Sequence, residues 1–294
     1  HMKKIKNMST ESLTKLFTYV ALITLAISII IPIGWVFFAS LKTNAEFYAS
    51  PWALPKSFHW QNFVDAFEKA KMGEYLITSV FVTAVALLIL LVVALPAAYV
   101  IARFEFRGKK AINSLFMGGL FINVNYIVIP IFLMLLSWNR IGQQMFGKDI
   151  FINNPLVLAV FYAATALPFT IYLLSGFFQT LPSAYEEAAM IDGCSYSQTM
   201  TKIMIPMAKP SIITIILFNF LSFWNEYIIS LTLLSGKIRT LPVGLINLQA
   251  AARGGAQPGI LYAGLVIVML PTLILYIFVQ KKLTEGMTLG GLKD

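Results

Sequence analysis

The polar segment from Leu181 to Pro210 carries the side chains that are best placed to act on a partner molecule. Within it Glu186 and Glu187 are adjacent, and Ala188 and Ala189 follow them directly. The helix dipole favours carboxylates in a first turn, and small alanines let the backbone of another protein approach closely. The pattern therefore predicts docking of a protein partner rather than catalysis. An amphipathic loop resting on the membrane surface is the alternative interpretation.

The first part of this segment has the pattern of a short helix followed by a reversal of the chain. Ser183 and Glu186 have the spacing of a capping box, which predicts a helix from Ala184 to Ile191. Gly193 tolerates the left-handed conformation that lets a chain turn back, and Asp192 before it is a common turn residue. We therefore expect a tight turn directly after this helix.

The second part repeats the capping pattern. Ser195 and Gln198 predict that another helix starts at once, and Pro206 marks its end. The whole segment is thus predicted to be a compact helix-turn-helix unit between two apolar runs.

A possible nucleotide site elsewhere in the chain fails on one residue. Gly142 to Lys148, GQQMFGK, nearly matches the phosphate-binding P-loop, but Asp149 stands where the motif needs a Ser or Thr hydroxyl for magnesium. The segment also follows an apolar helical run rather than a β-strand. Cys194 is the single cysteine and His59 has no partner at metal-ligand spacing. We therefore expect no metal, nucleotide or catalytic site, and no ATP hydrolysis by this chain.

The composition is that of an integral membrane protein. Of 294 residues, 58% are hydrophobic and 12% charged, and the mean hydropathy is +0.77, whereas roughly 25% of the residues of a soluble domain are charged. The net charge of +9 is then explained by lysines and arginines that hold cytoplasmic loops in place, and it does not indicate nucleic acid.

Six apolar stretches are long enough to cross a bilayer, which takes about 20 residues. They are Leu16 to Leu41, Leu76 to Ile101, Leu115 to Leu136, Leu156 to Phe178, Ile212 to Leu234 and Leu261 to Val279. The first is too long for the core of a signal peptide, so we expect a retained anchor at 16–41. The segment 42–74 then forms an outer loop, where prolines and aromatic residues predict short helices.

The distribution of positive charge predicts the orientation. An even number of spans puts both termini on one side, and with that side inside the cell the inner segments carry 13 of the 22 lysines and arginines. The short loop from Arg103 to Lys110 alone has four positive charges in eight residues. By the positive-inside rule the amino-terminal segment 1–15, the tail 281–294 and the loop 181–210 are cytoplasmic.

A polar stripe interrupts the fifth apolar stretch. Asn219, Ser222, Glu226 and Ser230 recur at steps of three and four residues and would share one helical face. Because a charge near the bilayer centre costs at least about 2.5 kcal/mol, this face should avoid lipid. Our hypothesis is a translocation path, whose residues are Asn219, Ser222, Trp224, Asn225, Glu226 and Tyr227. A structural contact with a partner helix, or an interfacial aromatic belt, is the alternative.

The loop resembles the EAA motif of ABC importer permeases. Glu187-Ala188-Ala189 is followed after three residues by Gly193, after nine more by Ile203, and then by Ile205-Pro206, with Ile205 where that family usually has Leu. Other stretches are similar to the carbohydrate-uptake branch of the family and its maltose-type G subunit. They are FASLKTNAEFYASPWALPKSFHWQNFVDAF, LPFTIYLLSGFFQTLP, FLSFWNEYIISLTLL, RTLPVGL and LTEGMTLGGLKD, which together cover about half of the chain.

This resemblance implies the fold and the function. The fold would be all-α and polytopic, the type I ABC importer transmembrane fold with six transmembrane helices, in which 75–280 is a five-helix core that includes the cytoplasmic coupling loop 181–210. The chain would be a non-catalytic permease subunit for a sugar or oligosaccharide, in the cytoplasmic membrane of a bacterium or archaeon. It would bind no cofactor itself, because ATP and magnesium belong to partner ATPase subunits.

The resemblance also implies partners and the residues that meet them. The partners are a second homologous permease, two ATPase subunits, an extracytoplasmic sugar-binding protein and membrane lipid, without nucleic acid. The residues that couple to the ATPase would be Glu186, Glu187, Ala188, Ala189, Asp192, Gly193, Ile203 and Pro206. Secondary contacts of the tail with the ATPase would involve Gly286, Gly290 and Lys293.

A secondary carrier or channel coupled to an ion gradient is the alternative from a different class. Such proteins ordinarily have several ionisable groups within the membrane, or interrupted helices in paired repeats. Here Glu226 is the one clear acidic group within a predicted span. We therefore favour the importer subunit.

Overall fold

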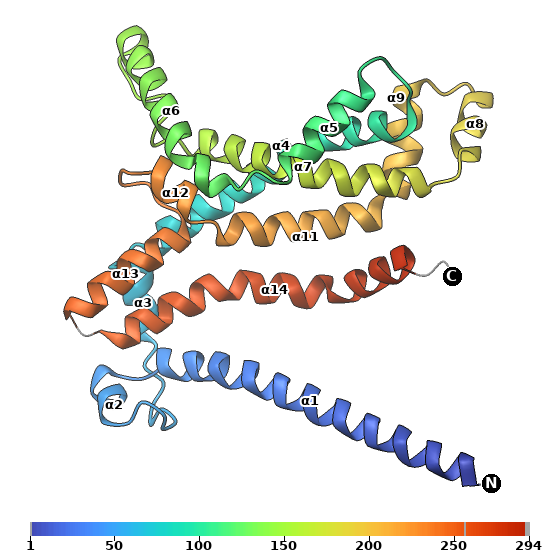
Figure 1. Ribbon diagram of the computed structural model, residues 1–294. Helices are drawn as coiled ribbons and strands as arrows, with labels where there is room; N and C mark the ends of the chain where they lie inside the picture. The colour runs from blue at the N-terminus through green and yellow to red at the C-terminus, as the bar shows by residue number, and fades with distance from the viewer. Residues whose placement is uncertain (1, 256, 292–294) are drawn as a thin grey trace. The chain divides into compact units, whose positions relative to one another are not determined.

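The fold is described from a computed structural model, which covers residues 2–255 and 257–291, with side chains for 12–250 and 257–280. These residues form helices and connecting segments, and none of the described residues lies in a β-strand (Figure 1). The chain divides into two compact units. One consists of residues 1–70 and 247–269, and the other of residues 71–246 and 270–294.

The smaller unit begins with a long apolar helix and two short ones. They are α1 (Met2–Ser40), α2 (Asn44–Ala49) and α3 (Gln61–Glu68). The sequence predicts short helices in 42–74, and α2 and α3 lie there. The unit is completed by parts of α13 (Leu241–Gly255) and α14 (Pro258–Gly291), which both continue into the larger unit.

Buried polar groups fix the connection between α1 and α3. Lys42 is only 2% exposed, and its ammonium donates hydrogen bonds to the carbonyl oxygens of Ser50 and Pro51 at 3.1 and 2.9 Å. The Asn62 amide, also buried, donates to the carbonyls of Ser40 and Lys42 at 2.8 and 2.7 Å. Since an unpaired buried carbonyl is costly, these two side chains stabilise the backbone on both sides of α2.

The larger unit contains the remaining helices. In chain order they are α4 (Met72–Arg103), α5 (Lys109–Gly119), α6 (Val124–Phe146), α7 (Pro155–Thr180), α8 (Ala184–Ile191), α9 (Tyr196–Thr199), the π-helix η1 (Met200–Met204), α10 (Ile205–Met207), α11 (Lys209–Asn225) and α12 (Ile228–Leu233). The first residues of α13 and the end of α14 belong to it as well.

The centre of the larger unit is the pair α4 and α7, which make the most extensive contact between helices. On α4 the fully buried residues recur at every fourth position, at Val82, Ala86, Leu90, Ala94 and Ala98. This spacing keeps them on one face of the helix. Because three of the five are alanines, the two backbones approach closely, as is common between helices in membranes.

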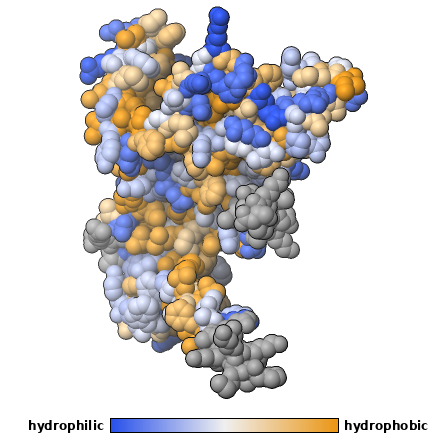
Figure 2. Space-filling view, turned by 45° about the vertical axis from the view of Figure 1, so that its right-hand side comes forward, coloured by the Kyte–Doolittle hydropathy of each residue, from blue (hydrophilic) through white to orange (hydrophobic). Residues whose placement is uncertain are grey.

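The helices have the length and composition of membrane spans. Among the described residues, five helices are long and apolar enough to cross a bilayer, at Ser12–Ser40, Met72–Arg103, Val124–Phe146, Pro155–Thr180 and Pro258–Gln280. A sixth is reached if Tyr196–Met207 and Lys209–Asn225, which are bent by 74°, count as one broken span. Large apolar areas also lie on the surface, as Figure 2 shows for one face. The predicted all-α, multi-pass fold is confirmed.

Two predicted spans have different bounds in the structure. The apolar stretch Leu115–Leu136 is not one helix, because α5 ends at Gly119 and α6 starts at Val124. Asn123 caps α6, since its side-chain oxygen accepts from the amide of Asn125 at 3.0 Å. A cap of this kind defines a new helix start, and the span therefore starts nine residues and ends ten residues further along the chain than predicted.

The stretch Ile212–Leu234 is also interrupted. The helix α11 ends at Asn225, Glu226 has an extended backbone with φ −71° and ψ 129°, and α12 begins at Ile228. The prediction that Asn219, Ser222, Glu226 and Ser230 lie along one continuous helical face is therefore wrong.

Candidate functional site

The helix α8 has the predicted bounds, but it begins differently. Ser183 has a helical backbone conformation, and its side chain accepts no hydrogen bond from the first turn. The predicted capping box of Ser183 and Glu186 is therefore wrong. The Glu186 carboxylate is engaged instead by Arg103 and Tyr99 of α4. Glu186 therefore binds Arg103, which is distant in sequence, and does not form a capping box with Ser183.

Arg103, Tyr99 and Glu186 form a half-buried polar cluster. Tyr99 Oη donates to Glu186 Oε1 at 2.8 Å, and Arg103 donates to Oε2 through Nε at 2.8 Å and through Nη2. Arg103 Nη1 donates in addition to the carbonyl oxygen of Leu181 at 3.0 Å, with a longer contact to that of Phe178 at 3.5 Å. The guanidinium therefore joins the end of α4, the last turn of α7 and the first turn of α8.

The neighbouring carboxylate points the other way. Glu187 is exposed, and in the described part of the chain it is not paired with a cation. Ala188 is exposed beside it, whereas Ala189 is buried against the rest of the loop. The adjacent glutamates of the predicted motif thus divide into one that faces inward and one that is free to meet a partner.

The turn after α8 has the predicted geometry. Gly193 has φ +78°, in the left-handed region that favours glycine. The amide of Cys194 donates to the carbonyl of Ala189 at 2.9 Å and that of Gly193 to Met190 at 3.1 Å, which is the pair of bonds that closes a Schellman motif. Asp192 is the exposed C-cap residue.

The second arm starts with the predicted capping box. The amide of Gln198 donates to Ser195 Oγ at 3.3 Å, and the amide of Ser195 donates to the side-chain oxygen of Gln198 at 2.9 Å. The arm then passes through α9, η1 and α10, where Ile203 is half-buried against the core and Pro206 is exposed near the start of α10. The helix ends at Met207, one residue after the proline that was predicted to end it.

The tip of this helical loop is apolar and exposed. Its large apolar side chains are Tyr185, Met190, Ile191 and Tyr196, and Ile191 is 86% exposed. Together with Glu187 they form a surface that combines an exposed carboxylate with exposed apolar side chains. We call Glu187, Ala188, Met190 and Ile191 the docking face.

The polar residues around the break between α11 and α12 are held mainly by contacts within the chain. The Glu226 carboxylate accepts from the amides of Ile229 at 2.7 Å and Ser230 at 3.1 Å, and from Tyr162 Oη at 2.8 Å. It therefore satisfies amides at the start of α12, which otherwise have no partner within the helix. Ser230 Oγ lies 2.6 Å from Thr240 Oγ1 in the interior.

The other predicted path residues divide by exposure. Asn219 is 4% exposed and donates to Thr170 Oγ1 at 3.2 Å, and Trp224 is 2% exposed and stacks on Phe220. The exposed members are Ser222, Asn225 and Tyr227. The structure brings the six residues to one end of α11, but only these three are open to the surroundings.

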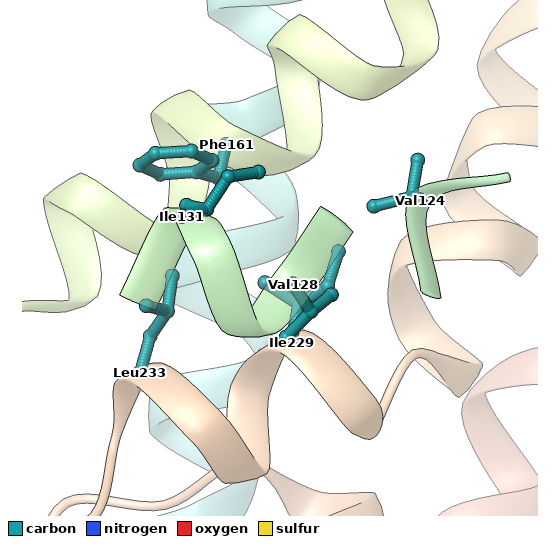
Figure 3. Close-up of a pocket in the computed structure, with 6 residues that line it drawn as sticks. All are labelled: Val124, Val128, Ile131, Phe161, Ile229 and Leu233. Atoms are coloured by element: carbon teal, nitrogen blue, oxygen red, sulfur yellow. The ribbon is translucent and has the colours of Figure 1, made fainter. Parts of the chain in front are cut away.

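Near this break the structure encloses a small apolar cavity. Its lining comes from α6, α7 and α12, with Phe161 beside Ile131 and Ile229 beside Val128 (Figure 3). Val124 and Leu233 complete it. All six side chains are apolar and offer no hydrogen bond to a hydroxyl group, so the cavity is part of the packing of α12 and does not suit a sugar.

The segment that resembles a P-loop lies in and after α6. Gly142 is buried within the helix, and Gly147 is its C-cap residue with φ +69°. The Asp149 carboxylate accepts from the side-chain amides of Asn139 and Gln143, both at 2.6 Å. The segment therefore forms a helix end rather than a loop around a phosphate. Among the described residues no group of three or more His, Cys, Asp or Glu side chains could hold a metal ion.

Three structurally important residues were not singled out from the sequence. Arg103 counted only as one charge of a cytoplasmic loop, and Tyr99 and Tyr162 were read as span residues. Each binds a carboxylate more than 60 positions away in the chain, so no local pattern reveals it. Of the predicted tail residues, Gly286 and Gly290 belong to the helical backbone of α14, and Lys293 lies outside the described residues.

The helices and the loop together define a multi-pass membrane protein that presents a helix-turn-helix docking face at one end of its core. Comparison with known proteins identifies its kind. Residues 75–284 match the family described as "Binding-protein-dependent transport system inner membrane component". The chain belongs to this family, and it is a permease subunit of an ABC importer rather than an ion-coupled carrier or channel. The predicted family is confirmed.

Relatives of known name match the chain over nearly its whole length. It is 31% identical to the diacetylchitobiose uptake system permease protein NgcG of Streptomyces coelicolor, over 93% of this chain and 87% of that protein. It is 28% identical to the trehalose/maltose transport system permease protein MalG of Thermococcus litoralis, over 97% and 99%.

Among solved structures, a chain of a bacterial ABC transporter involved in the import of the acidic polysaccharide alginate has the same fold. The TM-score is 0.75 with 21% sequence identity, and the match covers 92% of this chain and 97% of that one.

Proposed function

We propose that this permease subunit imports a sugar or oligosaccharide and that the docking face binds an ATPase subunit. The cargo is supported by the relatives, which are named for diacetylchitobiose and for trehalose and maltose. The observation that supports docking is that Glu186 is bound by Arg103 whereas Glu187 is exposed. One carboxylate and an apolar tip are therefore exposed on the same short helix. An exposed cluster of this kind is expected to be covered by a partner.

The importer that we propose contains four further protein subunits and is surrounded by lipid. The subunits are a second homologous permease, two ATPase subunits that bind ATP and magnesium, and an extracytoplasmic binding protein that delivers the sugar. The present chain is non-catalytic in this assembly and binds no cofactor. Its family is described as the inner membrane component of a transport system that depends on a binding protein, which supports this division of labour.

We also propose that the docking face is cytoplasmic, together with both termini. The basic segment from Arg103 to Lys110 runs from the last residue of α4 into the first turn of α5, and Arg103 is paired with Glu186 at the base of α8. The positive-inside rule places such a loop in the cytoplasm. Since the pair joins the two loops, the docking face lies at the same end of the core, where an ATPase would find it.

In this mechanism, closure of the ATPase pair displaces α8 and thereby turns the helices attached to the loop. Glu187 anchors and orients the docking face, and Gly193 permits the bend between the two arms. The second arm continues through Ala208 into α11, so a displacement of the loop reaches the break at Glu226. Secondary contacts of Gly286, Gly290 and Lys293 with the ATPases belong to the same proposal.

The path of the sugar is proposed along the exposed residues at the end of α11. Ser222, Asn225 and Tyr227 offer a hydroxyl, an amide and an aromatic face, the groups that bind sugars in polar pockets. The side chains behind this surface make contacts within the chain and would hold the exposed residues in position. They are Asn219, Trp224 and Glu226.

The test is transport by the reconstituted complex. The permease pair and its ATPases are placed in liposomes with ATP inside, and a labelled oligosaccharide is added outside with its binding protein. Uptake should require internal ATP and should persist when ionophores collapse the ion gradients. Uptake that survives withdrawal of ATP and stops with the ionophores would refute the proposal.

Orientation is tested separately with Cys194, the single cysteine of the chain. A membrane-impermeant maleimide should label it in inside-out vesicles and leave it unlabelled in intact cells whose outer membrane, where present, has been permeabilised. Labelling from the outside would place the docking face on the wrong side for any ATPase.

A further inference from the structure

We propose that Arg103 is a positioning residue that makes α8 move together with α4, so that work done on the docking face reaches the α4–α7 core. This inference rests on the proposed function, because it assumes that an ATPase displaces α8. It goes beyond that function in naming the side chain through which the displacement is transmitted. The inference rests on the geometry at the Arg103 guanidinium, where the end of α4, the end of α7 and the start of α8 meet.

The covalent connection alone would leave α8 free to pivot. Only Leu181, Pro182 and Ser183 separate the last residue of α7 from the first of α8, and Ser183 provides no capping bond. The Leu181 amide donates to the Phe178 carbonyl at 3.3 Å and so ties Leu181 to α7, whereas the Ser183 carbonyl accepts from the amides of α8. Among the described backbone hydrogen bonds, none joins α7 to α8 across this connection. A hinge of this kind lets a helix swing while the helix before it stays in place.

Arg103 closes this hinge from the side. Its Nη1 donates to the Leu181 carbonyl at 3.0 Å within the hinge, while Nε and Nη2 bind the Glu186 carboxylate on the far side of it. The carbonyl groups at a helix end lack partners within the helix, and a guanidinium can supply several donors in a fixed plane. One rigid group therefore fixes the positions of α7, the hinge and α8 relative to α4.

The hydrogen-bonding groups of the Glu186 carboxylate are paired, and the cluster is largely shielded from solvent. Both properties are needed if a displacement of α8 is to move α4. The side chains of Arg103 and Glu186 are 13% and 14% exposed. Both oxygens of the carboxylate are engaged, because Tyr99 donates to the one that Arg103 leaves free. In the described part of the chain, the hydrogen bonds that join α8 to α4 all end on this carboxylate.

The neighbouring charges of the same loop provide a contrast. Lys109 pairs with Glu105 at 2.7 Å, four residues apart, and the Glu105 side chain is 88% exposed. Such a pair is solvated and joins one short segment to itself, so it transmits nothing between helices. Glu105→Gln is therefore a matched control, which removes one carboxylate charge from the same end of the core.

The first experiment measures coupling in the complete reconstituted complex. Glu186→Gln keeps the shape of the side chain but removes its charge, and Arg103→Lys keeps the charge but loses the planar fork. For each variant we compare the ATPase subunits that co-purify, the rate of ATP hydrolysis and the sugar taken up per ATP. We expect both variants to retain the ATPase subunits while uptake per ATP falls about tenfold, and Glu105→Gln to match the wild type.

A residue that only stabilised the fold would lower assembly, hydrolysis and uptake together. The double variant Arg103→Glu with Glu186→Arg exchanges the two charges of the ion pair. Partial recovery of uptake per ATP in this variant would specifically support coupling through the pair. Unchanged uptake per ATP in both single variants would overturn the inference. Absence of ATP-dependent uptake in the wild type would instead count against the proposed function.

A second measurement needs no variant of the cluster and remains decisive if those variants fail to fold. Spin labels are attached to native Cys194, which follows α8 and whose amide is bonded to the Ala189 carbonyl of that helix at 2.9 Å. The second label is attached to a cysteine introduced by Val92→Cys, at a side chain of α4 that is 64% exposed. If α8 and α4 move together, the distance between the labels stays the same in the nucleotide-free and ATP-bound complexes. A shift of the whole distance distribution between these two states would show that α8 moves past α4, and would overturn the proposal.

Discussion

Replacement of Gly193 tests whether the bend of the coupling loop controls docking. Gly193 has φ +78°, and a Cβ added there would meet no atom within 4 Å. The cost of a side chain is therefore in the backbone alone, about 1–2 kcal/mol for alanine in the left-handed region and more for a β-branched residue. Asparagine tolerates this region, so Gly193→Asn is the matched control.

The magnitude follows from the population of the bent loop. If only the bent loop binds the ATPase, a cost of 1–2 kcal/mol weakens the apparent affinity by roughly 5- to 30-fold. Titration of the solubilised permease pair with ATPase subunits should give this loss for Gly193→Ala, a larger one for Gly193→Val, and near wild-type affinity for Gly193→Asn. The variants should all remain folded in the membrane. Equal affinity of the Val and Asn variants, or full sugar uptake by the Val variant, would refute the reasoning.

Three further predictions concern contacts away from the docking face. Asn62→Ala should lower the free energy of unfolding by about 1–3 kcal/mol, measured by denaturation in detergent, because it leaves buried carbonyls without donors. Tyr162→Phe should cost about 1.5–3 kcal/mol through the lost bond to the carboxylate of Glu226, with the affinity for sugar in uptake assays unchanged; a changed affinity would favour a direct role in the path. The bond from the Thr43 amide lowers the pKa of Glu46, so its contribution to stability is present at neutral pH and lost as the pH falls below about 4. The difference in melting temperature between wild type and Glu46→Gln should therefore shrink between pH 7 and pH 3.5, and a constant difference would contradict this.

The local geometry of the coupling loop could be predicted because short-range patterns determine it. The bounds of α8, the left-handed Gly193 and the capping box of Ser195 and Gln198 depend on residues within five positions of one another. The capping box at the start of α8 was predicted wrongly for the same reason. Glu186 fits a local capping box, but Arg103 lies 83 positions away and offers a charged, bidentate partner that outcompetes it.

The breaks within two apolar stretches could not be predicted from hydropathy. A run of apolar residues fixes how much of the chain prefers lipid, but it does not fix where a helix stops. Asn123 and Glu226 are the single polar residues that do so, each by accepting hydrogen bonds from the amides of the following helix. Their identity as caps depends on how the helix that follows each of them packs, which sequence periodicity does not reveal.

The short connection between α7 and α8 also restricts how this loop can vary in length. Each residue turns a helix by about 100°, so loss of one residue between Leu181 and Ser183 would offer Glu187 to Arg103 and leave Ala188 as the outermost position. The inward bond would survive, but the outward carboxylate would be gone. Insertions and deletions should thus be excluded from these three positions, where the carbonyl of Leu181 accepts a hydrogen bond from Arg103.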